Sequence, residues 1–184
     1  MGRLPFASPP LPSALWVRLS QFPAPNPSRP MLLVRQIFIS PGHNFFGRYG
    51  KAAGTHPTVE VDKVECVAGM GLKGDRFFGH RPDYKGQVTF FSGEVWRQLQ
   101  ARFNLSAFVP SVLRRNVIVE GGDLNTLVGR RFALQGIEFE ATEECRPCCW
   151  MDQAVAPGAE EWLKGRGGLR CRVLSGGTLR REDP

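Results

Sequence analysis

From Met31 onward the chain is a succession of short apolar or alternating runs, and each run is bounded by Gly, Pro or Asp. Runs of this kind, rich in Val, Ile and Phe between turn-forming residues, are typical of β-strands. They occupy residues 32–39, 58–67, 87–91, 116–119, 131–134, 137–142 and 170–174. Their spacing predicts a mainly β fold, a barrel or sandwich with a few short helices, rather than a parallel sheet with crossover helices.

Two segments between these runs carry helix signals. Ser92 can cap a helix that runs to Phe103, because its hydroxyl can accept a hydrogen bond from an amide of the first turn. A second helix is expected between Pro157 and Gly165, since its first turn is acidic and favours the helix dipole. No internal repeat at a fixed period is visible.

The first 30 residues differ from the rest of the chain. Residues 1–30 hold eight prolines and neither Asp nor Glu, a composition that supports neither a helix nor a sheet. We therefore expect a flexible N-terminal extension at 1–30, followed by one folded domain at 31–184. An upstream start before Met31, or a transit peptide, would also account for the extension.

Composition limits the partners and the compartment. A net charge of +7 and a pI near 9.6 favour an anionic partner, such as nucleic acid, a membrane surface or a phosphorylated small molecule. No run of about 18 apolar residues is present, so we expect no membrane span. The number of cysteines is odd, and three of the five are crowded together, which indicates reduced thiols and a cytoplasmic protein.

The crowded cysteines lie at 145–149, in the segment Glu144-Cys145-Arg146-Pro147-Cys148-Cys149. A thiol reacts as its thiolate, and the positive charge of Arg146 favours that form. We expect Cys148, which follows a stiff proline, to be the reactive residue. Other interpretations remain open: core packing of some of these thiols, a zinc knuckle from Cys145 and Cys148 completed by distant ligands, or a dithiol redox couple.

Two basic segments could bind an anion. The first, residues 69–76, is rich in glycine, which lets a backbone approach an anion closely, and it contains Lys73 and Arg76. Its spacing matches neither a phosphate loop nor a dinucleotide motif, and the alternative is a tight turn. In the second, Arg114 precedes a β-branched run, where its fork can bind an oxyanion. The adjoining Asn116 could bond the ligand or brace a loop; the alternative here is a strand with a polar edge.

The ordered set of segments resembles the MOSC domain, the module found at the C-terminus of molybdenum cofactor sulfurase. The likeness spans about residues 31–184. The residues that carry it are Gly71-Leu72-Lys73-Gly74-Asp75-Arg76, Gln87-Val88-Thr89, Arg114-Arg115-Asn116-Val117-Ile118-Val119-Glu120-Gly121, Leu127-Val128-Gly129, Pro147-Cys148, Gly165-Arg166-Gly167-Gly168-Leu169 and Arg172-Val173-Leu174.

This resemblance implies a β-barrel of the MOSC type and an essential cysteine at Cys148. In the family this cysteine is proposed to carry sulfur as a persulfide, and in the amidoxime-reducing relatives it is a ligand to molybdenum in a pterin cofactor. The basic residues that match, Lys73, Arg76 and Arg114, would hold the anionic cofactor. Asp75 would orient Arg76. The remaining members of the expected site are Asn116 and Arg146.

We therefore expect a MOSC-domain protein that binds molybdenum cofactor (molybdopterin) and carries or transfers sulfur. Its partners would be the pterin or a small sulfur acceptor, with a cysteine desulfurase or a molybdoenzyme as protein partner. The alternatives are a molybdenum-dependent reductase of N-hydroxylated compounds and a non-catalytic docking module. Pyridoxal phosphate is not expected, because the aminotransferase-like domain that uses it is missing. A small anion is favoured over nucleic acid, since no recognition-helix or aromatic RNA-binding pattern is present.

Overall fold

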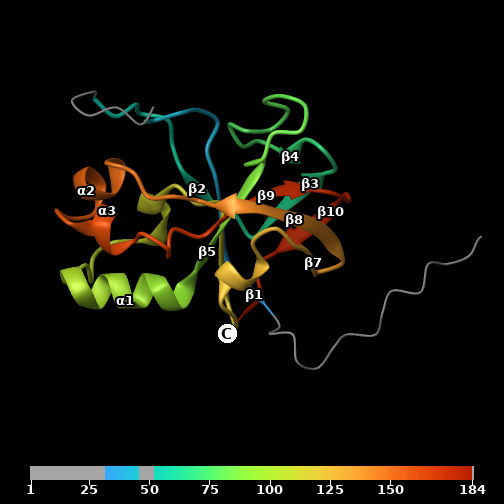
Figure 1. Cartoon of the computed structure of the whole chain (residues 1–184). Helices are drawn as coiled ribbons and strands as arrows, with labels where there is room; N and C mark the ends of the chain where they lie inside the picture. Colours follow the sequence, from blue (N-terminus) through green and yellow to red (C-terminus); the bar gives the residue numbers. More distant parts are fainter. Residues whose placement is uncertain (1–31, 46–51, 184) are drawn as a thin grey trace, which may run out of the picture.

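The computed structural model describes residues 32–45 and 52–183, so the expected N-terminal extension at 1–30 lies outside the described residues (Figure 1). In chain order the elements are β1 (Leu33–Ile39), β2 (Val59–Glu60), β3 (Lys63–Val67), β4 (Gly71–Leu72), β5 (Val88–Ser92), α1 (Gly93–Phe103), η1 (Pro110–Leu113), β6 (Val117–Glu120), η2 (Leu124–Leu127), β7 (Arg131–Leu134), β8 (Ile137–Glu144), α2 (Trp150–Ala154), α3 (Ala159–Trp162), β9 (Leu169–Val173) and β10 (Gly177–Arg180).

The strands form two sheets. The larger sheet has seven strands in the order β2-β1-β6-β5-β9-β8-β7, and the smaller has the order β10-β3-β4. All of these strand pairs are antiparallel except β5 and β6, which run parallel and are joined through α1 and η1. In Figure 1 the three α-helices gather on one side of the molecule, and the labels of the smaller sheet lie on the other.

The large sheet has a hydrophobic core on each face, and its central strands supply both. Successive side chains of a strand point to opposite faces. On β5, Phe90 belongs to the core that the smaller sheet covers, whereas Phe91 belongs to the core under the helices. On β6, Val117 and Ile118 divide in the same way. Burial on both faces explains why these strands read as continuous apolar runs rather than alternating ones.

The prediction of a mainly β fold with a few short helices is confirmed, but the sheets do not close into a barrel. The strands β2 and β7 lie at the two ends of the strand order and do not pair with each other, so the large sheet has two open edges. The parallel pair β5–β6 with its helical crossover was not expected. The run at 58–67 is two strands rather than one, because Val61 and Asp62 separate β2 from β3.

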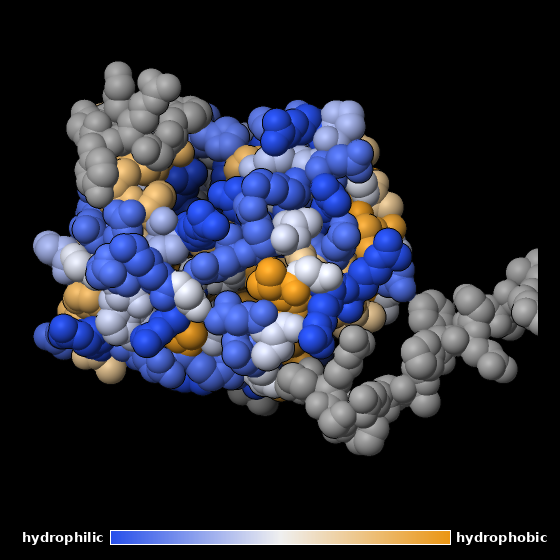
Figure 2. Space-filling model, viewed as in Figure 1, coloured by the Kyte–Doolittle hydropathy of each residue, from blue (hydrophilic) through white to orange (hydrophobic). Residues whose placement is uncertain are grey.

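The first predicted helix is confirmed in detail, since the Ser92 hydroxyl accepts a hydrogen bond from the Val95 amide at the start of α1. The predicted second helix is α3, and the short helix α2 was not predicted. Among the described residues, no helix has the length and apolar character that crossing a membrane requires. The face of the molecule in Figure 2 is mostly hydrophilic, with small scattered apolar areas.

Candidate functional site

Cys148 is the one cysteine of the five that is not buried, and all five thiols are free. Burial raises the pKa of Cys66 to about 11 and raises the pKa of Cys171 well above its ordinary value. Burial also raises the pKa of Cys149, with a further contribution from the neighbouring Cys148. These three thiols therefore stay protonated at neutral pH, which leaves Cys148 as the accessible nucleophile of the segment.

The backbone on both sides of Cys148 is fixed. Before it, the Cys145 amide donates a hydrogen bond of 2.7 Å to the Gly168 carbonyl. After it, the Cys148 carbonyl accepts a bond of 2.8 Å from the Met151 amide, as α2 begins. Pro147 lies between these two hydrogen bonds, and its ring fixes its backbone angle φ. The loop therefore holds Cys148 in a defined position.

A buried arginine ties this cysteine loop to the rest of the site. The guanidinium of Arg115 donates to three backbone carbonyls, those of Gly167 at 2.9 Å, Leu113 at 3.1 Å and Cys145 at 2.9 Å. These carbonyls come from three separate segments of the chain. The planar guanidinium has five N–H donors in a fixed arrangement, so it is better suited than a lysine ammonium group to join them. Arg115 therefore holds the cysteine loop against the chain that leads into β6.

The neighbouring residue, Arg114, lies near the sulfur of Cys148. Arg114 follows η1 with φ of 58°, a left-handed conformation that is uncommon outside glycine. Its guanidinium is influenced electrostatically by Cys148, lies over the Trp150 ring at 5.5 Å and donates to the Phe45 carbonyl at 3.3 Å. An arginine held in a strained backbone beside a partly exposed thiol is a candidate functional position.

Arg76 completes the basic side of the site. Its Nη1 pairs with the Asp75 carboxylate at 3.3 Å, and its Nη2 donates to the Arg114 carbonyl at 3.2 Å. The remaining donor, Nε, is buried and has no acceptor among the described residues. The Arg76 side chain is only 7% exposed, and a buried donor without a partner is costly, so this nitrogen fits an acceptor that a ligand would bring.

Electrostatics show an excess of positive charge around the Arg114 guanidinium. Burial and the repulsion of Arg76 lower the pKa of Arg114 to about 10, against the opposing effects of Cys148 and Asp75. Arg114 therefore remains charged at neutral pH, although its positive charge is poorly compensated. Three guanidinium groups face a single carboxylate here, an arrangement that favours an anion.

Asp75 and Asn116 form the buried support of this cluster. The Asp75 carboxylate accepts hydrogen bonds from the Ser40 amide at 3.2 Å, from Asn116 Nδ2 at 3.0 Å and from Arg76. Asn116 also accepts from the Thr89 hydroxyl at 2.9 Å and is 1% exposed. Asn116 Nδ2 also donates to the Phe38 carbonyl at 3.2 Å, so Asn116 joins β5 to the end of β1, while Asp75 is paired with Arg76.

A group of rings lies beside the arginines. The centroids of His43 and Phe77 are 4.9 Å apart, and those of His80 and Tyr84 are also 4.9 Å apart. Phe77 further contacts the Arg76 guanidinium at 5.0 Å. Burial, together with the charges of Arg76 and Arg114, lowers the pKa of His43, so its imidazole is neutral at pH 7. These residues form an aromatic wall next to the positive cluster.

Comparison with known families identifies the fold that carries this site. The family model of the MOSC domain matches residues 74–184. The chain belongs to the MOSC domain family. The match includes Arg76, Arg114 and Cys148, the three residues on which the site depends. The strand β1 lies before the matched residues, yet it pairs with β6 near the middle of the large sheet.

Solved structures support the MOSC fold. The YuaD protein from Bacillus subtilis is 20% identical over 83% of this chain and 93% of its own, with a TM-score of 0.65. YiiM from Geobacillus stearothermophilus is 14% identical over 83% of this chain and 73% of its own, with a TM-score of 0.58. YiiM from Escherichia coli is 16% identical over 82% and 66%, with a TM-score of 0.56. No curated protein sequence matches the chain.

Two of the predicted site residues, Lys73 and Arg146, lie on the surface of the domain. Lys73 is 64% exposed and forms an ion pair with Glu65 at 2.8 Å, a surface interaction that leaves it no described contact with the thiol. Arg146 is exposed, and the carboxylate on which it acts is that of Glu143. The cation whose pKa Cys148 influences is Arg114.

Sequence reasoning missed Arg115 as a functional residue, and it missed His43 and the rings near it. A signal for Arg115 existed: two adjacent arginines before a buried strand cannot both point the same way, so one of them must turn inward. No local signal could have joined His43 to His80, because only the fold brings these two residues together.

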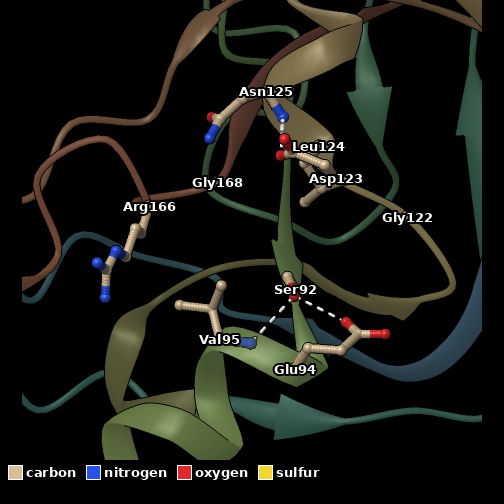
Figure 3. A pocket seen from close by; sticks show the side chains of 9 residues that line it. All are labelled: Ser92, Glu94, Val95, Gly122, Asp123, Leu124, Asn125, Arg166 and Gly168. Carbon is tan, nitrogen blue, oxygen red and sulfur yellow. Dashed lines mark hydrogen bonds between the residues drawn. The ribbon is translucent and has the colours of Figure 1, made fainter.

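A separate cavity of about 370 Å³ lies at the other end of β6, close to the start of α1. Figure 3 shows its lining, in which Ser92 and Asp123 are already hydrogen-bonded to neighbouring lining residues. The Ser92 hydroxyl donates to Glu94 at 2.8 Å, and the Asp123 carboxylate accepts from the Asn125 amide at 2.9 Å. Because none of its side chains is an unpaired buried donor, this cavity is a weaker candidate than the arginine cluster at Cys148.

Proposed function

We propose that this MOSC domain binds an anionic cofactor of the molybdopterin type at Arg76 and Arg114, and that Cys148 carries sulfur as a persulfide. The observation that supports this most strongly is the position of the partly exposed Cys148 thiol, within electrostatic reach of Arg114 and its excess of positive charge. The unpartnered Arg76 Nε offers a donor for a phosphate oxygen of the cofactor.

The donor set fits a metal that arrives inside its cofactor. Among the described residues, no group of three or more His, Cys, Asp or Glu could hold a metal ion unaided. Cys148 would then be a single protein ligand, and a soft thiolate suits molybdenum. When bound, the cofactor would supply a metal centre at which oxygen or sulfur is exchanged. The protein contributes the thiolate and the arginines that orient the anion.

Sulfur loading needs no outside oxidant. The Cys148 thiolate attacks the outer sulfur of a donor persulfide, a sulfur–sulfur bond forms at Cys148, and the donor thiolate leaves with the electron pair of the broken bond. Cys149 cannot substitute at neutral pH, because it is buried and its pKa is raised.

We expect Cys148→Ser to abolish sulfur loading and Cys149→Ser to preserve it. Each protein is incubated with a small organic persulfide and its intact mass is measured, where one added sulfur atom identifies the loaded form. Molybdenum content is measured in parallel after cofactor is supplied. It should be at least about tenfold lower in Cys148→Ser, since loss of even a residue that only supports a metal ligand lowers metal affinity about tenfold or more. Loading that persists in Cys148→Ser would refute the carrier role, and unchanged molybdenum content would refute the ligand role.

A further inference from the structure

The carboxylate that acts on Arg114 is that of Asp75, and both of its oxygens accept hydrogen bonds. The Oδ1 atom of Asp75 accepts from the Phe77 amide at 3.2 Å. The Oδ2 atom accepts from the Ser40 amide, Asn116 and Arg76. Asp75 is therefore shared among four donors and offsets the charge of Arg114 only in part, since the pKa of Arg114 is still lowered to about 10, and the remaining positive charge is available to a ligand.

The cluster is also poor in acids that could protonate a leaving group. Asp75 accepts four hydrogen bonds, so it serves as an acceptor rather than a proton donor. His43 is neutral at pH 7, because burial and the two arginines lower its pKa. A leaving group that must gain a proton gets no help from these groups, whereas a leaving group that is stable as an anion leaves readily and is attracted by the guanidinium groups.

We propose that Cys148 takes its sulfur from a donor of the thiosulfate class, whose leaving group is an oxyanion held by Arg76 and Arg114. This inference rests on the proposed function, since it names the substrate that would load the carrier cysteine. The unpartnered Nε of Arg76 and the charged fork of Arg114 supply donors for sulfonate oxygens.

The reaction balances without a redox partner. The Cys148 thiolate attacks the outer sulfur of thiosulfate, a bond forms between the two sulfur atoms, and the sulfur–sulfur bond of thiosulfate breaks. Sulfite leaves with the electron pair, and no proton is transferred. Cyanide can then remove the outer sulfur as thiocyanate, which regenerates the thiolate and gives a signal that can be followed continuously.

The test compares two donors of the same sulfur atom: thiosulfate, and a carboxylate-free organic persulfide that lacks an oxyanion. Loading of Cys148 is measured by intact mass on the full chain, and thiocyanate release is measured with cyanide. The key variant is Arg114→Gln, which removes a charge without emptying a fully buried position. The matched control is Arg102→Gln, which removes the same charge from the exposed face of α1.

We expect Arg114→Gln to slow loading from thiosulfate about tenfold or more, the effect of losing one charge-assisted hydrogen bond. Loading from the persulfide should fall by a clearly smaller factor, because that donor has no sulfonate oxygen for Arg114 to bind, and Arg102→Gln should alter neither rate. If wild-type protein loads from the persulfide but not from thiosulfate, or if Arg114→Gln slows both donors equally, the thiosulfate inference is wrong and the carrier role stands. If neither donor loads Cys148, the carrier role itself is wrong.

Discussion

Replacing Gly168 by alanine should destabilise the domain by about 3 to 5 kcal/mol, the sum expected for backbone strain and steric overlap. Gly168 has φ of +87°, and a Cβ there would lie 2.1 Å from the Phe90 carbonyl oxygen. The Gly168 backbone cannot move easily away from Phe90 on β5, because the Gly168 carbonyl accepts the hydrogen bond from the Cys145 amide. The free energy of unfolding, obtained from urea titration, measures the effect.

Gly165→Ala is the matched control, because it lies in the same loop. Gly165 also has a positive φ, +72°, but a Cβ there would meet no atom within 4 Å. It should therefore show only the conformational cost, about 1 to 2 kcal/mol. If the two variants unfold at the same urea concentration, then the close approach of the loop to β5 does not exist in solution.

Asp75→Ala should be comparably damaging, with a loss of about 3 to 5 kcal/mol, as expected when one member of a buried ion pair is removed. The Asp75 side chain is fully buried, and its partner Arg76 is nearly so. The substitution leaves the Arg76 guanidinium without its carboxylate, and it also deprives the Asn116 amide and two backbone amides of an acceptor. Urea unfolding of the purified variant gives the difference in free energy.

Asp123→Ala is the control, because it removes an exposed aspartate with fewer hydrogen bonds. Asp123 is exposed and accepts one local hydrogen bond, from the Asn125 amide at the start of η2. Its loss should cost about 1 kcal/mol, the usual value for a capping residue. A result in which Asp75→Ala is no more harmful than Asp123→Ala would show that Asp75 does not hold the arginine cluster together.

Strands with strong local signals were predictable, and elements that depend on distant partners were not. The runs at 32–39 and 131–134 became β1 and β7 almost residue for residue, because their composition and bounding turns are local properties. In contrast β4 has only two residues, and β10 begins at a glycine, so neither carries a pattern of its own. The parallel pairing of β5 with β6 depends on how α1 packs, which no short window of sequence reveals.

For the site, the sequence identified the residue types and the fold decided their geometry. Cys148, Arg76 and Arg114 are distant along the chain, and the structure brings them into one electrostatic neighbourhood. Lys73 lies next to the same motif as Arg76, yet it points into an exposed ion pair. Both cations lie in the turns that follow β4 rather than on a strand, so no regular period fixes their directions, and a basic motif alone cannot show which of its cations reaches the ligand.

Both proposals require the Cys148 sulfur to lie in a positive field made by Arg114 and Arg76. The most direct measurement compares the rates at which Cys148 reacts with iodoacetate, which is anionic, and with iodoacetamide, which is neutral. Peptide mass spectrometry assigns the alkylated residue, and glutathione gives the ratio of the two rates for a thiol in free solution.

We expect the ratio of iodoacetate to iodoacetamide rates at Cys148 to exceed that of glutathione by about fivefold or more, as expected for attraction of about 1 kcal/mol between unit charges a few ångströms apart. Arg114→Gln should bring the ratio most of the way back toward glutathione, and Arg102→Gln should leave it unchanged. A ratio at Cys148 equal to that of glutathione, in the wild-type protein, would contradict the account.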